Sequence, residues 1–131
     1  MAMNPEFRDY LLDQMGPLGP VQARRMFGGG GLFLDGAMFG LIADDVLYLK
    51  ADDVNRAAFE EKSMGPFTYE KKGLEAPVAL SYFEAPPDVL EDPEELCRWA
   101  RRAWEAARRA AKGAANKKVG KKGQNSRKAG K

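Results

Sequence analysis

The first apolar pattern in the chain has the spacing of an α-helix. From Phe7 to Met15, large apolar residues recur at positions i, i+3, i+4 and i+8, which places them on one face of a helix. Asn4 and Pro5 precede this stripe and combine an N-cap side chain with a proline at the first helical position. Gly16-Pro17 then breaks the pattern. We therefore predict a short amphipathic helix that begins at Asn4-Pro5 and ends before Gly16.

After the second glycine–proline pair, the pattern changes to short runs of β-forming residues. These runs cover residues 21–27, 32–34, 37–43 and 46–50. Asp35-Gly36 and Asp44-Asp45 separate the later runs, and such pairs favour tight hairpin turns. Apolar residues occupy both sets of alternating positions, so both faces of the sheet are apolar. The pattern predicts an antiparallel meander with helices on one face, and with more helix or a second subunit on the other.

The middle of the chain returns to helix and then to strand. Asp52-Asp53 can cap a second helix of two to three turns, which Gly65-Pro66 ends. Two further strands are expected at 67–69 and 78–83, joined by a loop. One helical turn is expected near 88–90.

The last helix is predicted from residue 93 onwards. Asp92-Pro93, followed by Glu95, combines an N-cap, a proline at the first helical position and a carboxylate at N3, which is a capping-box pattern. Five apolar residues then share one face of this helix: Leu96, Trp99, Ala100, Ala103 and Ala107. The predicted fold class is therefore α+β, in the order α-β-β-β-α-β-β-α, with an antiparallel sheet, flanking helices and a disordered basic C-terminal tail.

The composition removes most catalytic and metal-binding chemistry. The 131 residues contain no histidine and one cysteine, Cys97. A histidine-dependent nucleophile pair, an internal disulfide and a zinc–thiolate cluster are therefore excluded. We expect Cys97 to be a buried structural thiol, and we expect no cofactor, no metal and no enzymatic activity. The free thiol, together with the lack of a secretory signal or membrane-spanning stretch, predicts a cytoplasmic protein.

Three groups of residues are of types that occur in binding sites, but a structural role explains each of them better. The glycine run 28–31 resembles a phosphate-binding loop, but β-forming residues rather than a helix follow it, which favours a bulge or strand bend. Asp44-Asp45 and Asp52-Asp53 suit a hard cation, although roles in turns and at an N-cap explain them better. Arg24-Arg25 lies on a strand, where the two side chains point to opposite faces, so an exposed edge or an ion pair is favoured over a binding role.

Charge is distributed unevenly along the chain. Residues 112–131 hold seven lysines, one arginine and no acidic residue, whereas the first 111 residues carry 13 basic and 19 acidic side chains. Because Val119 is the only sizeable apolar residue in this segment, it is predicted to be disordered. Such a segment is expected to bind DNA or RNA phosphates without reading sequence. The predicted nucleic-acid-binding residues are Lys112, Lys117, Lys118, Lys121, Lys122, Arg127, Lys128 and Lys131.

Several motifs resemble the N-terminal domain of the TfoX/Sxy family of competence regulators. The most specific is RRMFGGGGL, from Arg24 to Leu32, and it continues through residues 35–50. Shorter matches lie at 67–69, 80–83 and 90–96, so the resemblance covers roughly residues 4–111. It implies a compact α+β domain of the YgaC/TfoX-N kind, similar to the type III secretion chaperone fold. It also implies no catalytic activity, and a role in activating competence genes together with a cyclic-AMP-responsive activator.

These observations lead to two readings of function. Residues 1–111 are predicted to form the TfoX N-terminal-like domain and 112–131 a disordered lysine-rich tail, in the place where full-length family members carry a second, helical domain. We expect a non-enzymatic regulatory or adaptor protein with weak, sequence-independent affinity for DNA or RNA, and with a transcription activator or another protein as partner. The alternative is a protein–protein adaptor or chaperone-like module whose tail only aids solubility or lies on the acidic domain. The second apolar sheet face predicts homodimerisation in both readings.

Overall fold

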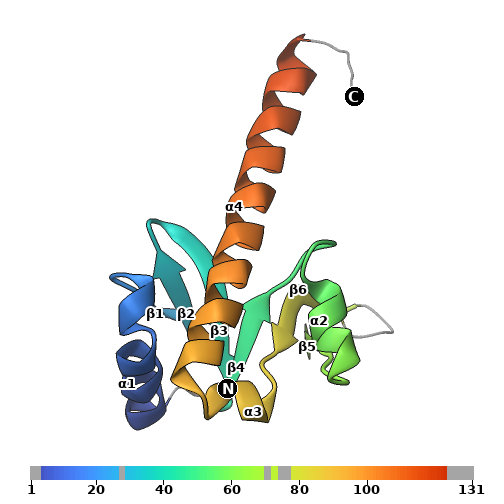
Figure 1. Cartoon of the computed structure of the whole chain (residues 1–131). Helices are drawn as coiled ribbons and strands as arrows, with labels where there is room; N and C mark the ends of the chain where they lie inside the picture. Colours follow the sequence, from blue (N-terminus) through green and yellow to red (C-terminus); the bar gives the residue numbers. More distant parts are fainter. Residues whose placement is uncertain (1–3, 27–28, 70–71, 74–77, 124–131) are drawn as a thin grey trace.

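The computed structural model describes residues 4–26, 29–69, 72–73 and 78–123. Within these described residues, four α-helices, a 3₁₀ turn and six strands follow one another (Figure 1). Their bounds are α1 Pro5–Gln14, η1 Gly16–Leu18, β1 Gln22–Met26, β2 Gly29–Leu34, β3 Ala37–Ala43, β4 Val46–Lys50, α2 Arg56–Glu61, β5 Pro66–Tyr69, β6 Val78–Glu84, α3 Pro87–Leu90 and α4 Pro93–Gly123. The α+β class is confirmed.

Helix α1 begins as the sequence predicts. The Asn4 side chain accepts a hydrogen bond from the backbone N–H of Glu6 at 2.8 Å, with proline at the first helical position. On the apolar face, Leu11 and Met15 are completely buried. Tyr10 is partly exposed, and its hydroxyl donates to the Leu90 carbonyl oxygen at 2.7 Å, which joins α1 to the end of α3.

All six strands form one antiparallel sheet in the order β1-β2-β3-β4-β6-β5. Both predicted hairpin turns are present, and their residues adopt positive φ angles: 51° at Asp35, 80° at Gly36, 51° at Asp44 and 62° at Asp45. Two successive positive φ angles match the twist of the flanking strands. The first meander contains four strands, whereas the predicted order has three.

Three glycines of the run 28–31 belong to the second of these four strands, and Gly28 lies outside the described residues. Gly29, Gly30 and Gly31 pair with β1, and Gly30 and Gly31 pair also with β3, so they form a regular part of β2 instead of a bend. A Cβ atom at Gly29 would collide with the carbonyl oxygen of Ile42, which is why the close approach of the strands requires glycine there. A bulge does occur, one step later, between Leu32 and Phe33.

The helices cover one face of the sheet. One buried cluster unites α1, α2, α3 and α4, represented by Leu11, Phe59, Val89 and Leu96, with strand residues such as Leu49. In Figure 1, α4 crosses the sheet and continues beyond it.

The alternate strand positions point to the opposite face, which we call the outer sheet face. Phe33, Tyr48 and Tyr82 lie there, and each is only partly buried. No helix of the described residues packs on this face. The prediction of helices on one face is therefore confirmed, while the predicted second subunit on the other stays a prediction.

Helix α2 is shorter than the sequence predicts, with six residues from Arg56 to Glu61. The buried Asn55 occupies its N-cap position, but the Asn55 side chain bonds instead to the Lys50 carbonyl oxygen and the Asp52 N–H. Asp52 in turn accepts from the Val54 N–H at 3.0 Å. The predicted capping aspartate therefore closes the turn that precedes the helix.

Helix α4 extends into the segment 112–131, whose predicted disorder stays a prediction. Helix α4 continues through Lys112 to Gly123, a length of 31 residues. Alanine and lysine are strong helix formers, and extending an existing helix avoids the cost of nucleation, which explains the continuation. The domain boundary at 111 stays a prediction, and Arg127, Lys128 and Lys131 lie outside the described residues.

Candidate nucleic-acid interface

Helix α4 is fixed at its beginning and along its inner face. The Asp92 carboxylate accepts from the N–H groups of Glu94 at 3.1 Å and Glu95 at 3.3 Å, so the predicted N-cap is confirmed. The Glu95 side chain pairs with Arg98. The five predicted apolar residues of this helix are all buried: Leu96, Trp99, Ala100, Ala103 and Ala107. Because the inner face of α4 is buried in the core, the charged residues of α4 lie on its outer side.

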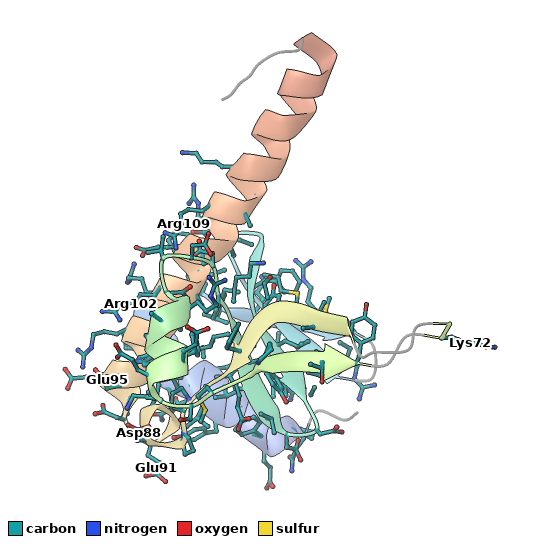
Figure 2. The ribbon with its side chains drawn as sticks, turned by 90° about the vertical axis from the view of Figure 1, so that its right-hand side faces the viewer. Lys72, Asp88, Glu91, Glu95, Arg102 and Arg109 are labelled. Atoms are coloured by element: carbon teal, nitrogen blue, oxygen red, sulfur yellow. The ribbon has the colours of Figure 1, made fainter. Side chains whose placement is uncertain are left out.

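Six cations with three- and four-residue spacings line this outer side. We call them the basic stripe, and they are Arg98, Arg101, Arg102, Arg108, Arg109 and Lys112. Figure 2 shows Glu95, Arg102 and Arg109 one above another along the helix. One acidic residue, Glu105, lies in the middle of the stripe.

Two cations of the stripe have carboxylate partners. Arg109 donates two hydrogen bonds to Asp52, from Nε at 2.7 Å and from Nη2 at 3.0 Å. This guanidinium lowers the pKa of Asp52, and the carboxylate raises the pKa of Arg109. Arg98 pairs with Glu95 on the preceding turn. These two cations are therefore largely occupied within the protein.

The other cations are directed outward. Arg108 lies over the ring of Trp104, 5.0 Å from its centre, and Trp104 donates its indole N–H to the Leu34 carbonyl oxygen at 2.9 Å. Arg101 and Arg102 are exposed and form no ion pair or side-chain hydrogen bond with the residues that the structure describes. The same holds for Lys112. Four positive charges are thus available to an external anion.

Two shallow hollows flank Glu105 on this surface. The lower one, about 380 Å³, has Leu18 and Cys97 in its lining and arginines 98, 101 and 102 at its side. The upper one, about 270 Å³, lies between Trp104, Arg108 and Lys112. Each hollow therefore combines an apolar floor with guanidinium or ammonium groups.

One of the predicted nucleic-acid-binding residues, Lys112, belongs to this surface. Lys112 is exposed at its upper end, and Lys117, Lys118, Lys121 and Lys122 follow on the last turns of α4. The sequence analysis assigned the interface to residues 112 and beyond, and not to the arginines that precede them. The three- and four-residue spacing of the arginines on a helix with a buried inner face is the signal that identifies the stripe.

The other candidate residues have structural roles. The Cys97 thiol donates to the Gln14 carbonyl oxygen at 3.3 Å, and desolvation raises its pKa, which disfavours the reactive thiolate. Arg24 lies over the Phe33 ring, 4.6 Å from its centre. Among the described residues, no group of three or more acidic or cysteine side chains is arranged to hold a metal ion. In the part of the chain that is described, no helix has the length and apolar character needed to cross a membrane.

Fold and surface together define a class: an α+β domain with helices on one face of a six-stranded antiparallel sheet, from which a long basic helix projects. Residues 13–107 match the model of the TfoX N-terminal domain, and the chain belongs to this family.

Two curated relatives support the assignment. The chain is 36% identical over 91 residues to DNA transformation protein TfoX1 of Aliivibrio fischeri, an alignment that covers 70% of this chain and 43% of that protein. It is 32% identical over 93 residues to an uncharacterized 12.7 kDa protein of Spirochaeta aurantia, encoded in the trpE 5′ region, with 70% and 72% coverage. The chain therefore spans less than half the length of TfoX1.

Proposed function

We propose that this protein is a non-enzymatic regulatory or adaptor protein related to competence, with weak, sequence-independent affinity for nucleic acid. The observation that carries the proposal is the group of eight cations without an acidic residue in 112–131, part of which extends α4 away from the acidic domain (Figure 1). The relative named a DNA transformation protein supports a role connected with DNA. The inert environment of Cys97 and the lack of histidine support the absence of catalysis.

The proposal is tested by fluorescence anisotropy with a labelled nucleic acid at several salt concentrations. Neutralising five to eight phosphates gives a slope of log K against log salt of about −4 to −7. Replacing the four lysines 117, 118, 121 and 122 by glutamine should weaken binding at low salt and reduce the magnitude of the slope by about 3 to 4. The matched control replaces the same lysines by arginine, which preserves charge and helix propensity. Equal binding by the glutamine and arginine variants would refute the role of these lysines.

The alternative function is a protein–protein adaptor without a nucleic-acid role, and the outer sheet face favours it. Five aromatic rings gather there: Phe33, Tyr48, Phe67, Tyr69 and Tyr82. Tyr48 and Phe67 contact edge to face, with ring centres 5.1 Å apart, and Phe67 stacks against Tyr69 at 6.5 Å. A partly exposed apolar face of this kind is typical of an interaction surface. A homodimer is the simplest such assembly.

Sedimentation velocity tests this alternative. A homodimer through the outer sheet face should dissociate when Tyr69, which is 38% exposed, is replaced by aspartate. Val54→Asp is the matched control, because Val54 is 72% exposed and lies away from this face, in the turn before α2. A wild-type protein that remains monomeric at high concentration would contradict the dimer.

A further inference from the structure

Several contacts attach the helix of the basic stripe to the rest of the domain. Its helix is anchored by a buried inner face, by the Asp52–Arg109 pair and by the hydrogen bond from Trp104 to β2. Arg108 is held over the indole ring, so its guanidinium has a defined place. Cations that are held in position lose less conformational freedom when they bind an anion.

The charge pattern of the stripe also differs from that of an ordinary exposed helix. On such a helix, acidic and basic residues usually alternate at three- and four-residue spacing and form pairs. Here six cations surround Glu105, and none of them lies within ion-pair distance of its carboxylate. The first 111 residues contain 19 acidic side chains, yet Arg101, Arg102 and Lys112 have no described partner among them. The basic stripe therefore carries an excess of positive charge along the outer side of α4.

We propose that the basic stripe binds the phosphate backbone of double-stranded nucleic acid, through Arg101, Arg102, Arg108 and Lys112. Glu105, which lies between the two hollows, repels the same phosphates and limits the affinity. This inference rests on the proposed function, from which it takes nucleic acid as the class of ligand. It adds a binding surface on the folded domain that does not depend on the lysines beyond residue 113.

A duplex fits this surface better than a single strand. Proteins that bind single strands without sequence preference stack the bases on exposed aromatic rings. The one aromatic ring at the stripe is that of Trp104, which is partly buried, hydrogen bonded to β2 and faced by Arg108. From Arg101 to Lys112 the helix rises about 17 Å, which equals the rise of about five base pairs of duplex. The stripe therefore offers cations over a length that several duplex phosphates occupy.

The experiment measures the anisotropy of labelled 20-base-pair DNA and RNA duplexes and of a single-stranded oligothymidylate, with the full chain over a salt series. The double substitution Arg101→Gln/Arg102→Gln should weaken duplex binding about tenfold at low salt and reduce the magnitude of the salt slope by about 2. Glu105→Gln should tighten duplex binding about threefold. The charge-matched control is Arg24→Gln/Arg25→Gln on β1, which should change binding less than twofold.

Two further variants separate the possible outcomes. Arg101→Lys/Arg102→Lys preserves both charges and should restore most of the affinity, while circular dichroism checks that each variant is folded. If the Arg101/Arg102 glutamine variant binds like the Arg24/Arg25 control, or if Glu105→Gln does not tighten binding, the stripe is not the interface. Binding of oligothymidylate as tight as that of the duplexes would also refute the proposal. The glutamine variant of the four lysines tests the proposed function separately, because it leaves the stripe intact.

Discussion

The ion pair between Asp52 and Arg109 gives a direct test of how α4 is attached to the rest of the domain. It joins the turn before α2 to the upper part of the stripe across 57 positions of sequence. Asp52→Asn and Arg109→Gln each remove the charge pair, and the asparagine retains an oxygen for the Val54 N–H. A double-mutant cycle with these two substitutions therefore isolates the coupling between the side chains.

The magnitude follows from the geometry and the exposure of the pair. Two hydrogen bonds at 2.7 and 3.0 Å favour a strong interaction. However, 27% of the Asp52 side chain and 42% of the Arg109 side chain are exposed, so water screens the charges. We therefore expect a coupling of about 0.5 to 1 kcal/mol. Asp52→Ala, which also removes the acceptor for Val54, should cost about 1 kcal/mol more than Asp52→Asn.

The pH dependence of the coupling has a definite sign. The arginine lowers the pKa of Asp52 in the folded protein below that of the unfolded chain, so the stabilisation is fully present above the unfolded value, about 3.9. It is lost as the pH falls through the lower folded pKa. Urea unfolding followed by the fluorescence of Trp99 and Trp104 measures the cycle at pH 7 and at pH 2.5. No coupling at pH 7, or the same coupling at pH 2.5, would refute the reasoning.

Two further predictions concern the core and the sheet. Phe59→Ala should destabilise the protein by about 3 to 5 kcal/mol in urea unfolding, because this ring is 1% exposed and lies between Phe83 and Trp99, whereas Val54→Ala should change stability by less than about 0.5 kcal/mol. Gly29→Ala should lower the melting temperature, because its Cβ would meet a backbone carbonyl, whereas Gly113→Ala, with open space around it, should raise the stability by up to about 1 kcal/mol. A Gly29→Ala protein as stable as wild type would show that the strands do not approach closely there.

The sequence was sufficient to predict those features of the structure that depend on residues only a few positions apart. The N-caps at Asn4 and Asp92 depend on residues two or three positions away, and both are confirmed. The hairpin at Asp35-Gly36 depends on backbone angles that these two residues adopt readily. The buried face of α4 was predicted because a helix places residues three and four apart on one side.

The position where α4 ends and the location of the basic stripe could not be predicted from neighbouring residues alone. Composition predicts disorder for residues 112–131, and this stays a prediction. The continuation of α4 to Gly123 depends on a helix that Leu96 and Trp99 anchor in the core. The stripe was not proposed from the sequence, because the pattern alone does not show which arginines have carboxylate partners elsewhere in the fold. The lysines beyond 113 could be proposed from the sequence because their lack of acidic neighbours is visible there.

The sequence by itself determined the kinds of elements, their approximate bounds, the turns and the excess of positive charge at the end of the chain, because each depends on residues close together. Only the tertiary structure decided that β6 pairs with β4, which puts β5 at the sheet edge, and that all four helices share one face. It also decided which cations are neutralised, since Asp52 reaches Arg109 across the fold while Arg101 and Arg102 remain without a described partner. Long-range packing sets these pairings, and no local pattern encodes them.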